Sequence, residues 1–357
     1  MDKHFHALKV AEIVPETAEA NSVRFEIPPE LRGAFAFKAG QHLTLKATID
    51  GEEVRRNYSL CTAPDEQDWM VTVKRIGGGL FSNWVGDALK PGDTLDVMPP
   101  HGSFTTEFAS DAKRHIVGIA GGSGITPVMS LLRTTLKEEP QSEFTLLYGN
   151  RDSSSIIFLE ELANLKDRYV DRLSLHHFLA EEEGDIDLFN GMLDRARCDE
   201  AITSLVGDPA AVDAWFICGP GPMMDAAESA LLDRNVERDR IHIERFTADR
   251  PSAALAAEMA QLQTKAAGAT VSVTLDGRTR RVAFSEANIL DSARAAGLPA
   301  PFACKAGVCA TCRAKVTGGK VEMAARYGLT DEEVAAGYVL TCQSVPVGEG
   351  VAVDYDA

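Results

Sequence analysis

The sequence predicts a multidomain α/β and β protein: an antiparallel β-barrel, a doubly wound parallel α/β domain, and a small C-terminal domain that carries a cysteine cluster. Three observations predict this fold class. Residues 1–108 alternate like strands and show little helical periodicity. Residues 109–247 alternate short apolar runs with helical segments. Four of the seven cysteines lie between positions 304 and 342.

Composition bounds the class of protein. The 357 residues are 45% hydrophobic and 25% charged, which is typical of a globular chain with two or three domains. The formal net charge of −17 disfavours partners that are nucleic acids or anionic membranes. No apolar run is long enough for a transmembrane helix, and the start lacks the apolar core of a signal peptide. We therefore expect a cytoplasmic protein, where clustered cysteines indicate metal or redox chemistry rather than disulfides.

The first domain is expected to be a barrel of antiparallel strands. Residues 42–49 and 70–74 alternate roughly between apolar and polar side chains. Asp50-Gly51 and Pro91-Gly92-Asp93 interrupt these runs as turns. A compact antiparallel barrel over residues 1–108 follows from this pattern.

The second domain, residues 109–247, is expected to be a parallel sheet flanked by helices. The strands are predicted at 115–120, 144–149, 173–179, 214–218 and 241–244. The helices are predicted at 127–136, 158–165 and 222–235. An alanine-rich stretch at 248–268, which contains Arg250-Pro251-Ser252, then predicts a linker that is partly helical. Strand-like alternation returns at Val271, so the last domain is expected over residues 269–357.

The cysteines of the last domain have the spacing of an iron–sulfur protein. Cys304-x4-Cys309-x2-Cys312, followed by Cys342, is the plant-type spacing of a [2Fe–2S] cluster. Small residues in the loop let the backbone approach the cluster and donate N–H groups to its sulfurs. The alternatives are a structural zinc site and unrelated cysteines, but zinc ligands usually come as two closely spaced pairs. Residues 269–357 resemble the plant-type ferredoxins, which implies a β-grasp fold.

Two segments of the first domain indicate a flavin. Arg56-Asn57-Tyr58-Ser59 ends a predicted strand. Gly77-Gly78-Gly79-Leu80-Phe81-Ser82 follows another strand and opens a helix predicted at 81–89. Flexible glycines beside a helix N-terminus provide backbone N–H groups for an anion, and the spacing suits a pyrophosphate.

Two glycine-rich turns of the second domain indicate a pyridine nucleotide. Gly122-Ser123-Gly124-Ile125-Thr126-Pro127 lies between a strand and a helix, with Pro127 expected at the first helical position. Cys218-Gly219-Pro220-Gly221-Pro222-Met223 occupies a second strand-to-helix turn. Arg151 follows the second strand, where a guanidinium can pair with a 2′-phosphate. This favours NADPH over NADH, although Arg151 also suits a solvated loop.

With these motifs, residues 1–247 resemble the ferredoxin–NADP reductase superfamily, whose flavin motif is Arg-x-Tyr-Ser. The resemblance implies that Arg56 binds the FAD pyrophosphate, that Tyr58 packs on the flavin, and that Ser59 lies near the flavin N5 atom. It implies a phosphate cradle made by Lys74, Gly79, Leu80 and Ser82. FMN is the alternative flavin, and the glycine-rich turn favours FAD.

The same resemblance assigns the nicotinamide site. It implies that Cys218 stands near the nicotinamide C4 atom with Thr126 opposite. The remaining nucleotide contacts are expected from Gly122, Gly124, Pro127, Gly219, Pro220 and Met223. Glu244 and Phe246 are expected near the flavin, with Phe246 either stacked on it or part of an ordinary core. Cys61 and Cys198 fit no motif and are expected to be structural.

Together these parts predict an electron-transfer reductase. A nicotinamide delivers two electrons as hydride, a [2Fe–2S] cluster accepts one, and a flavin links the two steps. The order of domains resembles the reductase components of multicomponent oxygenases. Residues 39–45 and 49–60 are similar to the reductase subunits of phenylacetyl-CoA epoxidases, which implies that electrons pass to a di-iron oxygenase. The chain has no Glu-x-x-His pairs of a di-iron bundle, so oxygen activation is expected in another chain.

Two alternatives remain at this point. One is a reductase of the same architecture that serves another oxygenase or a hybrid-cluster protein. The other is a redox sensor or carrier that binds the cofactors without sustained turnover. The intact motif around Cys218 argues against the second.

Overall fold

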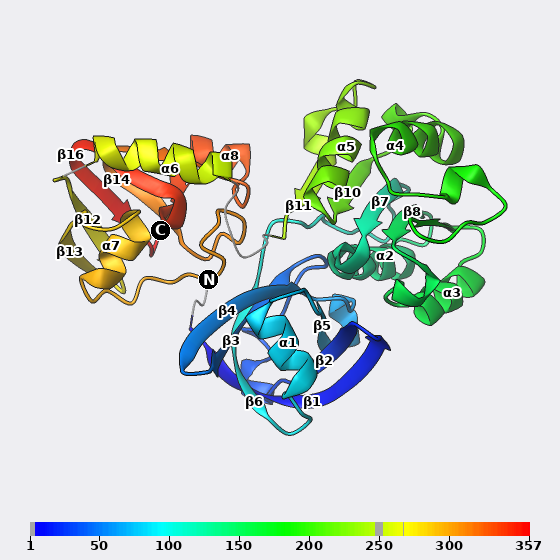
Figure 1. The fold of residues 1–357 in the computed structure, drawn as a ribbon, viewed down its shortest axis with the longest axis horizontal. Helices are drawn as coiled ribbons and strands as arrows, with labels where there is room; N and C mark the ends of the chain where they lie inside the picture. Colours follow the sequence, from blue (N-terminus) through cyan, green and yellow to red (C-terminus); the bar gives the residue numbers. More distant parts are fainter. Residues whose placement is uncertain (1–3, 247–252, 267) are drawn as a thin grey trace. The chain divides into compact units, whose positions relative to one another are not determined.

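A computed structural model of the protein describes residues 4–246, 253–266 and 268–357 (Figure 1). Its contacts divide these residues into two compact units. One unit holds residues 4–54 and 58–246, and the other holds residues 55–57, 253–266 and 268–357. Within the described ranges, no helix has both the length and the apolar character needed to cross a membrane.

The first domain is a six-stranded sheet curled around a single core (Figure 1). The strands, hydrogen-bonded in the order β4-β3-β6-β1-β2-β5, are β1 (His6–Thr17), β2 (Ala20–Glu26), β3 (His42–Ile49), β4 (Glu52–Ser59), β5 (Trp69–Lys74) and β6 (Thr94–His101). Alternate side chains of every strand point into one apolar core, because successive residues of a strand face opposite sides. Helix α1 (Leu80–Asp87) adds Phe81 and Val85 to this core. The predicted antiparallel β domain is confirmed.

The second domain is built on a five-stranded sheet. The strands, in the order β11-β10-β7-β8-β9, are β7 (His115–Gly121), β8 (Glu143–Asn150), β9 (Leu173–Leu179), β10 (Ala214–Cys218) and β11 (Ile241–Glu244). All neighbouring strands are parallel. Their carboxyl ends therefore share one edge of the sheet, which is where ligands of such folds bind.

Helices cover both faces of this sheet (Figure 1). Helices α2 (Ile125–Glu138) and α3 (Leu159–Arg168) pack on the face that contains Phe216. Helices α4 (Arg195–Ala201) and α5 (Gly221–Leu232) pack on the face that contains Trp215. The near-continuous apolar runs of the strands follow from burial on both faces.

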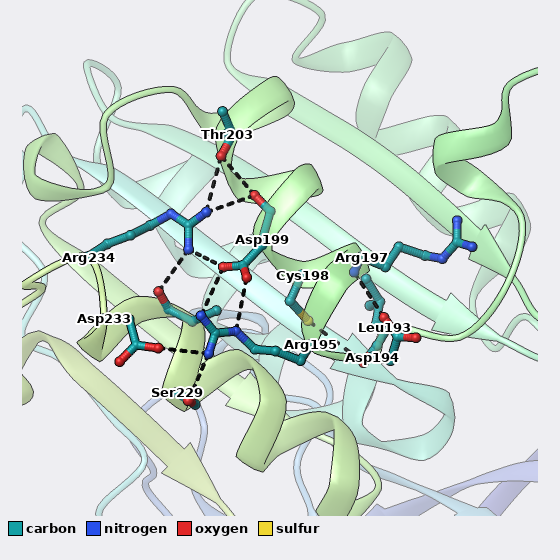
Figure 2. Close-up of polar contacts among 11 residues, drawn as sticks. Leu193, Asp194, Arg195, Arg197, Cys198, Asp199, Thr203, Ser229, Asp233 and Arg234 are labelled. Atoms are coloured by element: carbon teal, nitrogen blue, oxygen red, sulfur yellow. Dashed lines mark hydrogen bonds and ion pairs between the residues drawn. The ribbon is translucent and has the colours of Figure 1, made fainter.

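Sequence reasoning missed α4, which is short and rich in charge. It begins after Asp194, whose carboxylate accepts a hydrogen bond from the Arg197 N–H. Figure 2 shows Arg195 and Arg234 converging on the carboxylate of Asp199, and Arg195 also donates a hydrogen bond to Ser229 of α5. Arg234 lies 35 residues after Asp199 in the chain, so no short-range sequence pattern predicts this contact.

The C-terminal domain is a second five-stranded sheet with the order β13-β12-β16-β14-β15. Its elements are β12 (Thr270–Leu275), β13 (Arg278–Ala283), α7 (Ile289–Ala295), β14 (Arg313–Met323), α8 (Asp331–Ala335), β15 (Tyr338–Leu340) and β16 (Ser344–Asp354). Strand β16 pairs parallel with β12 and antiparallel with β14. Helix α7 buries Ile289, Leu290 and Ala293 against the sheet.

Part of the segment expected to be a linker is helical. Helix α6 spans Ala253–Lys265, and its Leu262 packs with Ala266 and Val345. The Gln263 side-chain amide donates a hydrogen bond of 3.0 Å to the carbonyl of Ala287. Arg250-Pro251-Ser252 lies outside the described residues. The predicted domain boundaries stay predictions.

Candidate functional site

The four predicted cluster cysteines come from two places in the C-terminal domain. Cys304, Cys309 and Cys312 lie in the loop between α7 and β14, and Cys342 lies in the turn that follows β15. The Cys304 and Cys309 thiols share a hydrogen bond, which raises the pKa of the first and lowers that of the second. A hydrogen bond with Cys312, followed by burial, raises the pKa of Cys342. The four thiols therefore lie close enough to one another to influence one another's protonation.

The loop places backbone N–H groups close to these sulfurs. The Ala306 N–H donates to Cys304 Sγ at 3.3 Å. Lys305 and Ala310 adopt φ of +54° and +53°, and Gly307 adopts φ of +79°. A Cβ at Gly307 would lie 3.0 Å from the Ala325 Cβ, so only glycine fits without displacing neighbours.

This donor set fits a [2Fe–2S] cluster. Four neighbouring thiols are the ligand set that two irons need, and an N–H group that donates to sulfur, as that of Ala306 does to Cys304, tunes such a cluster. Among the described residues, no group of three or more His, Cys, Asp or Glu side chains is placed to hold a single metal ion.

The other candidate site lies where β4 of the barrel ends near the carboxyl ends of β10 and β11. Ser59 is the last residue of β4, and its Oγ donates a hydrogen bond of 3.0 Å to Glu244 Oε2. Glu244 ends β11 and pairs in register with Cys218 of β10. Cys218 is fully buried, and burial followed by the Glu244 charge raises the pKa of its thiol. The structure therefore brings Ser59, Glu244 and Cys218 together.

The two glycine-rich turns of the nucleotide domain contact each other directly. A Cβ at Gly124 would lie 2.0 Å from the Cys218 carbonyl oxygen. A Cβ at Gly121 would lie 2.6 Å from Pro220 Cδ, and one at Gly219 would lie 2.9 Å from the Gly121 backbone nitrogen. Glycines are required here because the backbones of the two turns touch. Pro220 then precedes α5, whose first turn contains the buried Met223.

Thr126 and Pro127 lie within the first turn of α2, which changes one expectation. The helix begins at Ile125, after a 3-10 turn at Gly122–Gly124, so Pro127 is its third residue and not its first. Proline is tolerated there because the first N–H groups of a helix have no partner within the helix. The buried Thr126 donates its hydroxyl to the Ser123 carbonyl at 3.0 Å, which closes the turn.

The predicted phosphate cradle of the barrel is a tight turn before α1. A Cβ at Gly79 would lie 2.4 Å from Ile76 Cγ1 and 2.6 Å from Ser82 Oγ. The Ser82 hydroxyl accepts from the Ile76 N–H at 3.3 Å, so it fixes the turn. Space is open around Gly78, and Leu80 is exposed. An anion beside the α1 N-terminus fits this turn.

The remaining flavin candidates lie on β4 and β5. The Arg56 guanidinium donates to its neighbour's carbonyl, and the Tyr58 ring lies 5.8 Å from that of Phe81. A Cβ at Gly122 would lie 3.6 Å from Lys74 Nζ. Lys74, expected in the flavin cradle, therefore lies beside the nucleotide turn.

Arg151 and Phe246 lie at the rim of the nucleotide domain. Arg151 is paired with Asp152 at 3.0 Å and with Glu19 at 3.7 Å. Beside it, the buried Asn150 carboxamide makes no hydrogen bond with any described residue, which leaves two polar atoms for a ligand. Phe246 is 39% exposed, so it is not an ordinary core residue.

Two cysteines lie outside both sites. Cys61 donates to the Met70 carbonyl at 3.3 Å, and Cys198 faces the Leu193 carbonyl at 3.7 Å (Figure 2). Both are buried, and burial raises the pKa of each thiol to about 12. Neither is reactive as a thiolate in such surroundings.

Sequence reasoning missed His42, which faces Glu244. Its Nδ1 lies 3.6 Å from Glu244 Oε1. His42 follows Gln41 in the segment used for the family resemblance, but its partner is far along the chain. Only the folded arrangement of the strands reveals this pair.

Comparison with known protein families identifies each of the three predicted domains by itself. Residues 7–106 match the oxidoreductase FAD-binding domain, residues 119–229 match the oxidoreductase NAD-binding domain, and residues 273–347 match the 2Fe-2S iron-sulfur cluster binding domain. The protein thus contains the domains for FAD, a pyridine nucleotide and a [2Fe–2S] cluster.

Full-length relatives align with nearly the whole chain. The chain is 42% identical to a subunit of the 1,2-phenylacetyl-CoA epoxidase of Escherichia coli K12, covering 99% of this chain and 98% of the relative. It is 36% identical to the ferredoxin reductase component of 3-ketosteroid-9-alpha-monooxygenase from Rhodococcus rhodochrous, and this alignment covers 98% of this chain and 96% of the relative. The fold is similar to that of phthalate dioxygenase reductase, with a TM-score of 0.59, 24% identity and 98% of both chains covered. The chain is an oxidoreductase that belongs to the family of reductase components of multicomponent oxygenases.

Proposed function

We propose that the protein passes electrons from NADPH through FAD and a [2Fe–2S] cluster to a di-iron oxygenase, the ring 1,2-phenylacetyl-CoA epoxidase. The observation that carries the proposal is the meeting of Ser59, Glu244 and Cys218 at the carboxyl edge of the nucleotide sheet. The relative with 42% identity is named as a component of that epoxidase, and this supports the choice of acceptor.

FAD, when bound, accepts two electrons from a nicotinamide and releases them one at a time. The roles of the chain's own residues are binding and orientation. We assign the nicotinamide to the apolar surroundings of Cys218 and Thr126, because both are buried at the two touching glycine turns. Ser59 would fix the flavin edge from the barrel side, and Glu244 holds the Ser59 hydroxyl in place.

The phosphates of both cofactors would lie at helix N-termini. We assign the FAD pyrophosphate to Arg56 and the Gly79–Ser82 turn, where α1 begins. We assign the nucleotide pyrophosphate to the Gly122–Gly124 turn, where α2 begins and Lys74 Nζ is close. Backbone N–H groups and the helix dipole favour an anion at both places.

NADPH is inferred from Arg151 at the carboxyl end of β8. An arginine pairs well with a 2′-phosphate, and the Asp152 carboxylate orients this guanidinium. Phe246, exposed at the end of the domain, is proposed to cover the flavin until the nicotinamide replaces it. The four thiols of Cys304, Cys309, Cys312 and Cys342 would hold the cluster as two pairs.

The test is an anaerobic titration of the purified protein with NADPH and then with NADH, followed by its visible spectrum. We expect the flavin and cluster absorbance to bleach together, at lower concentrations of NADPH than of NADH. Bleaching of neither chromophore would contradict the proposal, and bleaching of the flavin alone would favour a sensor or carrier. Coupled turnover with the epoxidase oxygenase component, and not with a 3-ketosteroid oxygenase, then tests the acceptor.

A further inference from the structure

His42 and His101 form a buried pair of imidazoles in the barrel. His42 begins β3 and His101 ends β6, and the two residues are partners across the antiparallel strands. Their rings meet edge to face with centroids 4.2 Å apart. His42 is 5% exposed, so the polar atoms of its ring depend on the protein or a ligand, and not on bulk water, for their partners.

The His42 ring faces the carboxylate that Ser59 binds. Its Nδ1 lies 3.6 Å from Glu244 Oε1, while Glu244 Oε2 accepts the Ser59 hydrogen bond at 3.0 Å. The first distance is longer than a hydrogen bond, so the attraction is electrostatic in this state. The two oxygens of one carboxylate are thus engaged from two sides, by the hydroxyl that ends β4 and by the ring that begins β3.

The surroundings of the ring decide which nitrogen carries the proton. The carboxylate beside Nδ1 favours a proton there, because an N–H then points toward negative charge. Nε2 is buried and has no hydrogen-bond partner among the described residues. A bare nitrogen lone pair at that position costs less than a buried N–H without an acceptor. The Nδ1–H tautomer follows.

Gly102 keeps the ring in this place. It adopts φ of +124°, and a Cβ there would lie 2.9 Å from His42 Nδ1. Any other residue would be strained at this φ and would also push the ring away from its present position. The turn after β6 therefore makes room for the imidazole that faces Glu244.

We propose that His42 is a positioning residue: its Nδ1–H holds the Glu244 carboxylate in the orientation that accepts the Ser59 hydrogen bond. The inference rests on the proposed function, in which Ser59 and Glu244 border the flavin and the nicotinamide. His42 acts on the reaction only through Glu244. Without it, the carboxylate keeps one anchor and gains freedom to rotate away from Ser59.

Three variants test the position of the donor. In His42→Asn the amide nitrogen stands where Nδ1 stood, whereas in His42→Gln it stands near the place of Nε2. His115→Asn is the matched control. His115 is half-buried at the first position of β7, at the other end of that strand from the Gly122–Gly124 turn, and it contacts Thr145 rather than Glu244. Each variant is mixed anaerobically with NADPH, and the rate of flavin bleaching is measured over a range of nucleotide concentrations.

We expect His42→Gln to lower the limiting rate about tenfold, with the half-saturating NADPH concentration unchanged, because loss of orientation affects the chemical step. His42→Asn should recover most of the rate, and His115→Asn should match the unsubstituted protein. Equal loss in His42→Asn and His42→Gln, or a change confined to the half-saturating concentration, would overturn the proposal.

A second readout does not depend on turnover. ¹⁵N NMR of histidine-labelled protein distinguishes the Nδ1–H from the Nε2–H tautomer, and we expect His42 as Nδ1–H. Replacement of Glu244 by Leu should abolish that preference, and an Nε2–H signal in the unsubstituted protein would contradict the inference. If neither nucleotide bleaches the flavin of the unsubstituted protein, the proposed function fails, and the NMR result still decides the His42–Glu244 contact.

Discussion

Ser59 Oγ and Glu244 Oε2 lie 3.0 Å apart and form a hydrogen bond between residues 185 positions apart in the chain. The bond joins the last residue of β4 to the last residue of β11. Cys218, the strand neighbour of Glu244, lies beside it. A hydroxyl, a carboxylate and a buried thiol are therefore gathered from a barrel and a parallel sheet.

Replacing Ser59 with alanine should slow reduction of the flavin. The change removes the hydroxyl and leaves the 13%-exposed Glu244 carboxylate without this donor. We expect the limiting rate of anaerobic bleaching by NADPH to fall about tenfold or more, with FAD content unchanged. Ser229→Ala is the control, because that hydroxyl lies on α5 and accepts a hydrogen bond from Arg195 (Figure 2). Full activity of Ser59→Ala would remove Ser59 from the site.

Replacing Cys342 with alanine should abolish the cluster and leave the flavin. The variant breaks the pair with Cys312, so one of the two irons would lose a ligand. We expect visible absorbance of flavin alone, and iron and sulfide near zero in the purified protein. Cys198→Ala, at a buried cysteine outside the loop, should retain both chromophores. Retention of a full cluster by Cys342→Ala would contradict the ligand set.

Replacing Arg151 with serine should weaken the preference for NADPH. If Arg151 reads the 2′-phosphate, its loss removes a charge-assisted hydrogen bond, and the ratio of NADPH to NADH efficiency should fall about tenfold. Arg195→Ser provides the control, since Arg195 is also an arginine paired with carboxylates on the domain surface. An unchanged ratio in Arg151→Ser would show that Arg151 is a solvated charge.

Replacing Arg114 with methionine should destabilise the nucleotide domain. Two nitrogens of the Arg114 guanidinium bind the fully buried Glu139 carboxylate. Nε donates to Oε2 at 3.1 Å, and Nη2 pairs with Oε1. Breaking a buried pair from one side leaves an unpaired charge and costs about 3–5 kcal/mol. The midpoint of urea unfolding measures this loss. Lys320→Met, which breaks the exposed pair with Glu322, should change stability by less than about 1 kcal/mol.

Acid should destabilise the same domain through its partly buried histidines. Burial lowers the pKa of His176 and His177 in β9. The unfolded chain therefore takes up protons near pH 6.5 while the folded chain does not, so stability is full above that pH and declines below it. We expect the melting temperature to fall between about pH 7.5 and about pH 5.5. His177→Phe should show a smaller fall, and an identical fall would assign the effect to other groups.

The sequence alone determined the three domains and the chemistry of their cofactors. Cys304-x4-Cys309-x2-Cys312, the Arg56–Ser59 motif and the two glycine turns are local patterns. Each is imposed by a backbone that must approach a cluster or a phosphate, so each can be recognised without the fold. The strands of the parallel sheet were also predictable, since burial on both faces makes them continuously apolar.

The tertiary structure alone decided which residues meet. It placed Pro127 third in α2, Lys74 beside Gly122, and His42 against Glu244. It also formed α4, whose charged side chains pair with charged residues just after α5. These contacts join residues far apart in the chain, and their energy comes from burial and from charges brought close together by the fold. A local sequence pattern carries no information about contacts between residues so far apart in the chain. For that reason Ser59 and Glu244 could be predicted from the sequence, whereas the contact of His42 with Glu244 could not.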